Sequence, residues 1–487
     1  MRSWAAGAAV YFTSCLFFSL PTGAPIGGGY LDPVGKIGAQ DESVYSHIAI
    51  RMAERGGWPT PVFMDRYFLY KPPLLYWLSG LSARILGISP HSLRLPSVLA
   101  AAGVCLLVFL WTRSVVAVVL LATSPLFANL AARNLTDAPL CFLITLAMWL
   151  VYRDQRLQSW STIAGIGAAS GCAILMKSTA GLIPLAILAA FWTLSRERAA
   201  FWKLAAIGGV ALCVAAPWFI YQYLTHQRWF WGEFVQVELL AYGRSAPPQT
   251  TGEGTLAFYA SRLIWAAPVL LIGLIAAAAA SRRRWREFQL PLLWLGTLLL
   301  ALAGYQYRNA TYLLLFLPAM AIIASTRFPV FALLGAAWFL LAPKVHPGNA
   351  IPELLRERCE SGRTNELIVA ADDQFHAAVL PFRKVRYAFP GEAQPPPGFS
   401  LDFRKMGITV TVDEFLDLDK YGEKFVDEMR AWGLEDYSAI ATVIALTKPG
   451  DLERLMKARP DADYLVRGTI VKTAYVPVSP PARSCAM

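Results

Sequence analysis

The chain is a series of long apolar segments separated by short polar turns. The apolar segments have roughly the length of membrane-spanning helices, about 17 to 22 residues each. They are residues 3–22, 94–111, 114–132, 138–152, 160–176, 178–195, 203–222, 259–280, 288–304, 309–325 and 328–342. We therefore predict a polytopic α-helical membrane protein with about eleven transmembrane helices.

Cationic residues follow alternate apolar segments. The clusters are Arg113, then Arg153 and Arg156, then Arg196, Arg198 and Lys203, then Arg282, Arg283, Arg284 and Arg286, then Arg327. Cytoplasmic turns carry an excess of Lys and Arg, so these turns are predicted to be cytoplasmic, and Arg2 places the N-terminus on the same side. An odd number of spans then puts the chain after Lys344 outside. A cleaved signal peptide is an alternative for residues 3–22, and it would leave residue 41 on the same side.

Residues 72–88 look like one more span but break this alternation. Counting PPLLYWLSGLSARILGI as a span would invert every later helix and put the arginine clusters outside. We therefore predict a helix at the outer interface, with Arg84 and the ring edges of Tyr76 and Trp77 near water.

Composition agrees with a membrane protein and divides the chain near Lys344. Of the 487 residues, 56% are hydrophobic and 16% are charged. Residues 1–344 contain 26 Lys and Arg against 12 Asp and Glu (net +14), whereas residues 345–487 contain 18 against 21 (net −3). The positive charge belongs to the membrane part, where it serves orientation and contact with anionic lipids. Nothing indicates nucleic-acid binding.

The tail, residues 345–487, is long enough for a separate extracytoplasmic domain. Strands are predicted from LIVAA (367–371), KVRYAF (384–389), ITVTV (408–412) and YLVRGTIV (464–471), and helices from 413–432 and 450–458. The expected fold is a small α/β domain. Cys359 and Cys485 lie in it, and an oxidising compartment would permit a bridge that the sequence alone does not establish.

Polar residues gather on the predicted outer side of the bundle. Nine of the twelve acidic residues before Lys344 fall there, beside three isolated cations, Lys71, Lys177 and Arg308. Asp41 opens a segment whose apolar residues trace one helical face, and Asp137 precedes a span. Each position therefore also fits the residue preferences of a helix N-cap. Lys177 and Arg308 also fit ordinary snorkelling at an interface.

Several motifs occur together in a fixed order in the outer loops and span ends. The first outer loop (23–93) contains the acidic pair Asp41 and Glu42, a GGWPTP turn, KPPLLYW and RLPS. Later motifs are SPLFANLAARNLTDAPL (124–140), ILMKSTAGLIPL (174–185), FWGEFVQVELLAYGR (230–244) and RNATYLLLFLPAMAI (308–322). Over residues 30–325 the chain resembles the bacterial aminoarabinose-transferase and protein-mannosyltransferase-like group of the GT-C superfamily.

The resemblance implies a GT-C catalytic domain in residues 1–344. The implied activity is transfer of a sugar from a polyprenyl-phosphate donor to a lipid, glycan or protein acceptor at the outer leaflet of the bacterial inner membrane, with inversion. Asp41 matches the catalytic carboxylate, Asp137 the acid of the second loop, and Lys71 the lysine that meets the donor phosphate. A carboxylate that accepts a proton and fixed positive charge beside a leaving phosphate suit this chemistry. Lys177 and Arg308 are predicted to add to that charge.

Two positions depart from the group's pattern. Where aminoarabinose transferases typically carry a Glu before the lysine and a His in the later outer loop, this chain has Tyr70 and Leu239. The loss of both argues against a metal, so we predict no cofactor. Glu42, Glu238 and Tyr70 are predicted to line the acceptor side of the site, although Glu238 also fits a solvated surface acid.

Two roles are open for the later outer loop (223–258), and two other classes of protein are alternatives to an enzyme. Aromatic residues suit a helix at the membrane boundary, and GRSAPPQTTGEG follows as either a mobile flap or an inert loop. A lipid or solute transporter without chemistry is one alternative class, and a non-catalytic carbohydrate-binding receptor with a degenerate transferase body is another, although the intact Asp41 and Lys71 argue against the receptor. Transporters usually place ionisable groups near the membrane midplane, whereas the predicted spans are nearly free of charge. This favours an enzyme.

Overall fold

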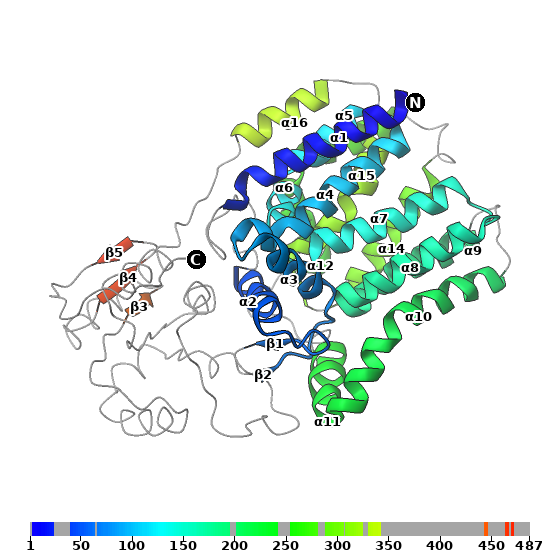
Figure 1. The fold of residues 1–487 in the computed structure, drawn as a ribbon. Coiled ribbons are helices and arrows are strands. Elements are labelled where there is room, and N and C mark those ends of the chain that lie inside the picture. Colours follow the sequence, from blue (N-terminus) through cyan, green and yellow to red (C-terminus); the bar gives the residue numbers. More distant parts are fainter. Residues whose placement is uncertain are drawn as a thin grey trace, which may run out of the picture.

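A computed structural model shows that apolar helices form one bundle (Figure 1). The structure describes residues 2–23, 39–63, 66–194, 201–241, 254–280, 288–305, 307–324 and 330–341, and three strands at 443–446, 463–466 and 469–471. Its core is a continuous cluster of buried aliphatic and aromatic side chains contributed by nearly every helix.

Five long helices form a row through the bundle. They are α1 (Arg2–Ser19), α4 (Pro90–Thr112), α7 (Asp137–Arg153), α8 (Trp160–Lys177) and α10 (Phe201–His226). Each packs against the next in this order.

Small residues permit this close packing. A Cβ atom added to Gly167 would lie 2.6 Å from Val210, and one added to Gly171 would lie 2.7 Å from the carbonyl oxygen of Ala211. Glycines four residues apart let two membrane helices approach closely, as α8 and α10 do here.

The remaining apolar helices are shorter, and several predicted spans are broken. The helices are α5 (Val115–Ala122), α6 (Pro125–Ala131), η2 (Ser178–Leu182), α9 (Ile183–Leu194), α12 (Thr255–Ala266), α13 (Pro268–Ala280), α14 (Gln289–Ala303), η6 (Ala310–Phe316), α15 (Leu317–Ala324) and α16 (Val330–Leu341). Breaks fall before Pro125 and Pro268, where the missing amide hydrogen and the ring favour the start of a new helix. The second break bends the chain by 105°.

The predicted number of eleven spans is therefore not confirmed. Within the described ranges, four helices are long and apolar enough to cross a membrane, or up to five if the bent pair α12–α13 counts as one span. One of them, Trp160–Leu194, changes direction at Ser178 (φ 40°), where η2 folds back onto α8. The apolar segments were found correctly, but breaks divide several of them into short helices.

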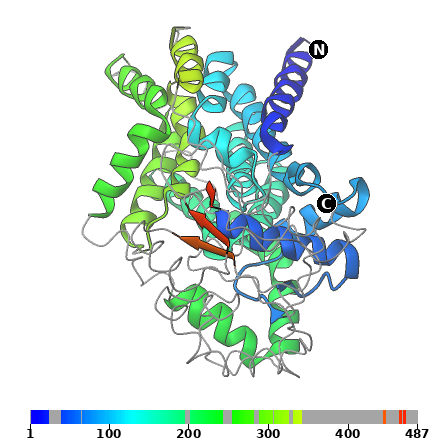
Figure 2. The same cartoon turned by 90° about the vertical axis from the view of Figure 1, so that its left-hand side faces the viewer.

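The described part of the predicted first outer loop forms a compact layer at one end of the bundle. It contains α2 (Ala39–Arg55), the hairpin of β1 (Val62–Phe63) and β2 (Arg66–Tyr67), and α3 (Leu74–Leu86). In Figure 2, which views the molecule from the left-hand side of Figure 1, α2 lies in front of the bundle. Gly56 and Gly57 end α2 with positive φ angles of 78° and 74°, as their position predicts.

α3 has the dimensions of an interfacial helix. Its 13 residues span roughly 20 Å, short of the roughly 30 Å of a bilayer core. Arg84 is exposed, as predicted. The prediction for Tyr76 is wrong, because its ring is fully buried against α2, and Trp77 is half-buried with its indole nitrogen donating to the carbonyl oxygen of Trp58 at 2.6 Å.

In the tail, three strands form a small mixed sheet. β3 (Val443–Leu446) pairs in parallel with β4 (Asp463–Val466), which pairs antiparallel with β5 (Thr469–Val471). The predicted run 464–471 is therefore two strands, which pair antiparallel with each other. The other strands and helices predicted for the tail, and both of its cysteines, lie outside the described residues.

The predicted orientation can be tested at two exposed positions. In a cysteine-free background, a cysteine replacing Arg55 at the end of α2 should react with an impermeant thiol reagent on intact cells. One replacing Gln158 in the α7–α8 turn should react only after the membrane is opened, because that turn belongs to a predicted cytoplasmic arginine cluster. The reverse labelling pattern would invert the predicted topology.

Candidate active site

Five of the predicted site residues lie together where the predicted first outer loop meets the bundle. Asp41 is on α2, Lys71 lies between β2 and α3, Asp137 begins α7, Lys177 ends α8, and Glu238 is on η3 (Trp231–Ala241). The charges of the other four all act on the Asp41 carboxyl. Residues far apart in the sequence thus form one polar cluster.

Asp41 occupies the first turn of α2 and is not its N-cap, because the helix begins at Ala39. The N-cap alternative is therefore wrong, although a carboxylate in the first turn still interacts favourably with the helix dipole. Part of the side chain reaches solvent, but protein atoms surround the carboxyl group. Burial among these atoms raises the pKa of the carboxyl. Lys71 and Lys177 oppose the rise, whereas Asp137 and Glu238 add to it.

The Lys71 ammonium forms an ion pair with Glu238. Two features hold Lys71 in place. Pro72 and Pro73 follow it and restrict its backbone. Two residues earlier, the amide of Leu69 donates to the buried carboxylate of Glu233 at 2.8 Å.

The helical form of η3 explains why two of its acids face the same segment. η3 is a π-helix, whose i to i+5 hydrogen bonds place residues five apart on neighbouring turns. Glu233 and Glu238 have this spacing, and they contact Leu69 and Lys71. A π-helix is frequent at functional sites.

The second ion pair joins the ends of two bundle helices. Lys177 Nζ lies 2.9 Å from Asp137 Oδ1, and the ammonium also lies 5.2 Å from the centre of the Tyr312 ring. An acid at the start of α7 and a cation at the end of α8 each suit the local helix dipole. Asp137 is the first residue of α7, and the structure gives its carboxylate this partner in place of a capping hydrogen bond.

Arg308 and Tyr70 are two further residues predicted for the site. Arg308 Nε donates to Thr255 Oγ1 at 3.3 Å. Tyr70 is buried, with its ring 5.5 Å from that of Phe68. The nearby Tyr305 has a pKa raised to about 12, chiefly by burial and also by the charge of Glu238.

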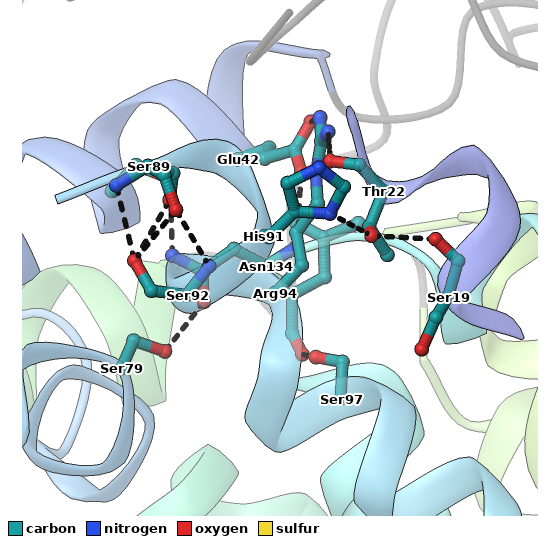
Figure 3. A network of polar contacts seen from close by, with 12 residues as sticks. Ser19, Thr22, Glu42, Ser79, Ser89, His91, Ser92, Arg94, Ser97 and Asn134 are labelled. Atoms are coloured by element: carbon teal, nitrogen blue, oxygen red, sulfur yellow. Dashed lines mark hydrogen bonds and ion pairs between the residues drawn. The ribbon is translucent and has the colours of Figure 1, made fainter. Parts of the chain in front are cut away.

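Glu42 lies in a separate buried network (Figure 3). Its carboxylate accepts from Arg94 Nε at 2.8 Å and from the backbone amide of Asn134 at 3.0 Å, and its side chain is 0% exposed. This geometry favours a structural role for Glu42 over the predicted place in an acceptor wall.

The GGWPTP turn is fastened to the end of α10. The indole nitrogen of Trp218 and the amide of Gln222 both donate to the carbonyl oxygen of Pro59, at 2.8 and 2.6 Å. Thr60 contacts His226 Nε2 at 3.1 Å. The motif thus ties the hairpin before Lys71 to the helix that leads into η3.

Sequence reasoning missed Glu233, Arg94, Asn134 and Tyr312. One signal was available for Arg94, because an arginine at the start of an apolar span requires a partner, and the acid Glu42 stood in the preceding loop. The π-helical register that selects Glu233 has no comparable signal. Within the described ranges, no group of three or more His, Cys, Asp or Glu side chains is arranged to hold a metal ion.

Comparisons with known proteins find similar sequences. Residues 70–221 match the family model described as dolichyl-phosphate-mannose-protein mannosyltransferase. An undecaprenyl phosphate-alpha-4-amino-4-deoxy-L-arabinose arabinosyl transferase from Yersinia pestis is 27% identical over 278 residues, which is 53% of this chain and 48% of that protein. The chain spans about half the length of the curated relatives it matches.

Solved structures share the fold. ArnT from Cupriavidus metallidurans in the apo state superimposes with a TM-score of 0.61 and 15% identity, over 86% of this chain and 90% of that chain. ArnT from the same organism bound to undecaprenyl phosphate gives a TM-score of 0.53 and 18% identity, over 74% and 64%. The fold is therefore that of a polytopic helical membrane protein of the GT-C type. The predicted resemblance to the aminoarabinose-transferase and protein-mannosyltransferase-like group is confirmed.

Proposed function

We propose that this protein is an integral-membrane glycosyltransferase that uses a polyprenyl-phosphate-linked sugar as donor. The acceptor is a lipid, glycan or protein at the outer face of the bacterial inner membrane, and the anomeric carbon is inverted. One observation carries the proposal: Asp41, on an outer-loop helix, lies within the electrostatic reach of Lys71 and Lys177. The curated Yersinia relative acts on an undecaprenyl-phosphate sugar, and a solved structure of the same fold holds undecaprenyl phosphate.

The residues have complementary tasks in this reaction. The acceptor nucleophile attacks the anomeric carbon from the face opposite the phosphate, its proton passes to Asp41, and the electron pair of the breaking C–O bond passes to the phosphate oxygen. The phosphate gains negative charge in this step, and a nearby ammonium stabilises it. Desolvation raises the pKa of Asp41, which makes it a better proton acceptor near neutral pH than an ordinary aspartate.

The two ion pairs suggest how the site remains intact before the donor arrives. Glu238 neutralises Lys71, and Asp137 neutralises Lys177. Each ammonium therefore has a counter-ion before the donor binds. A donor phosphate that binds Lys71 would take the place of the Glu238 carboxylate. Charge-assisted hydrogen bonds of this kind are about twice as strong as neutral ones.

Two linked measurements test the function. Mass spectrometry of lipid that co-purifies with the protein should reveal a polyprenyl-phosphate sugar. Addition of an outer-envelope extract should then release polyprenyl phosphate and move the sugar to a component of the extract. Movement of intact donor lipid across vesicles, without release of polyprenyl phosphate, would instead support the transporter alternative.

Transfer is expected to be independent of metal. Tyr70 and Leu239 occupy the positions where a carboxylate and an imidazole would complete a ligand set, so Lys71 and Lys177 must neutralise the leaving phosphate. Activity should therefore survive prolonged dialysis against EDTA and gain little from added Mg²⁺, Mn²⁺ or Zn²⁺. Reversible loss on chelation, restored by one ion, would contradict this prediction.

A further inference from the structure

A buried ion pair joins the first outer loop to the bundle beside the active site (Figure 3). Arg94 Nε donates to Glu42 Oε1 at 2.8 Å, and Arg94 Nη2 donates to Glu42 Oε2 at 3.2 Å. Both side chains are 0% exposed. The third guanidinium nitrogen, Nη1, donates to the carbonyl oxygen of Thr22 at 2.8 Å. The pair thus binds η1 (Leu20–Gly23), α2 and α4 together.

The same network reaches the turn before α7 through Asn134. The backbone amide of Asn134 donates to Glu42 Oε1 at 3.0 Å, and its side-chain nitrogen donates to Ser46 Oγ on α2 at 3.0 Å. Ser79 Oγ on α3 donates to the side-chain oxygen of Asn134 at 2.8 Å. Glu42 and Asn134 are thus the centre of a buried network. Ser46 on α2, Ser79 on α3 and Arg94 on α4 contact them.

The positions of these two residues in the sequence are informative. Glu42 is adjacent to Asp41, and Asn134 lies three residues before Asp137. Each of these two residues belongs to a segment that carries one of the two acids. The network is thus a direct connection between the backbone segments of Asp41 and Asp137.

Stability alone is a weak reason for such a pair. Two buried charges lose much hydration, and replacing a buried ion pair with apolar side chains of similar volume is often neutral or stabilising. A bidentate pair between a guanidinium and a carboxylate does, however, fix direction as well as distance.

We infer that Glu42, Arg94 and Asn134 form a positioning unit that sets the location of Asp41 relative to Asp137. The inference rests on the proposed function for its catalytic consequence, whereas its structural consequence can be measured without chemistry. A displacement of about 1 Å in a reacting group can cost about a hundredfold in rate. Loss of the unit should therefore lower kcat while the contacts of Lys71, and with them donor KM, change little.

The main test is the double variant Glu42→Met with Arg94→Met, which removes both charges at similar volume. We expect the melting temperature to fall by only a few degrees, kcat to fall about a hundredfold, and KM for donor to stay within about threefold. Hydrogen exchange should accelerate in residues 39–46 and 134–138. Glu54→Gln, an exposed acid on the same helix, is the matched control and should change none of these quantities.

Arg94→Lys keeps the charge but cannot make the bidentate pair, so it provides the test if the double variant does not fold. It should lower kcat about tenfold and accelerate the same exchange, with KM for donor retained. A folded variant of either kind with wild-type kcat and exchange would overturn the inference. If the wild type transfers no sugar, the proposed function fails by itself, and hydrogen exchange alone then supports or overturns the positioning unit.

Discussion

Replacing Asp41 with Asn should lower the turnover number for sugar transfer by about two to four orders of magnitude. Removal of a general base has this range of effect, because the amide cannot accept the proton of the acceptor nucleophile. The protein should fold as the wild type does, since Asp41 is exposed and α2 is held by its buried apolar face. Binding of undecaprenyl phosphate should be retained, because the Lys71 ammonium is unchanged.

The measurement is single-turnover transfer with saturating donor, accompanied by a melting curve and a titration with undecaprenyl phosphate. Glu54→Gln makes a similar acid-to-amide change further along α2 and should be fully active. If Asp41→Asn transfers sugar at the wild-type rate, Asp41 is only a first-turn acid of α2. The base must then be sought at Asp137, whose carboxylate pairs with Lys177.

The pH profile gives an independent check on Asp41. Desolvation raises the pKa of its carboxyl, and a base works only when it is deprotonated. The acid limb of kcat/KM in the wild type should therefore lie above the ordinary aspartate pKa of 3.8. In Asp41→Asn this limb should disappear from the residual activity, and an unchanged limb would assign it to another group.

The sequence predicted most of the helical part of the fold because its signals are local. Apolar runs located the helices of the bundle, and the face of Val44, Ile48 and Met52 predicted the buried side of α2. The breaks were missed because they depend on a single residue within an apolar run. At the break after α8, Ser178 takes a positive φ of 40°, and three residues later Gly181 lies so close to the backbone of Ala173 and Ile174 that an added Cβ would collide with it.

For the site, sequence order and motifs identified the residues but not their pairing. Isolated charges beside apolar segments singled out Lys71 and Lys177, and the motifs attached roles to Asp41 and Asp137. That Glu238 would neutralise Lys71 could not be predicted, because 167 residues separate them and η3 has a helical form that its composition does not reveal. Glu42 was assigned to the wrong environment for a similar reason, since its partner Arg94 lies 52 residues away.

Replacing Lys71 with Ala should weaken binding of undecaprenyl phosphate roughly tenfold to hundredfold, as a hydrogen bond between charged groups contributes about 1.5–3 kcal/mol. Two effects act in the same direction. The phosphate loses the ammonium, and Glu238 loses its counter-ion and faces the incoming anion. Affinity for the acceptor should change much less. Equal donor affinity in the variant and the wild type, measured by titration in detergent, would remove Lys71 from the site.

The same substitution should also move the acid limb of kcat/KM, and the sign can be derived from the charges around Asp41. Lys71 lowers the pKa of the Asp41 carboxyl, so its removal should raise that pKa and shift the limb to higher pH. Glu238 raises the same pKa, so Glu238→Gln should shift the limb to lower pH. In the double variant the two shifts oppose each other, and the limb should return toward its wild-type position. Shifts of one sign in both single variants would show that the limb does not report a carboxyl lying between these two charges.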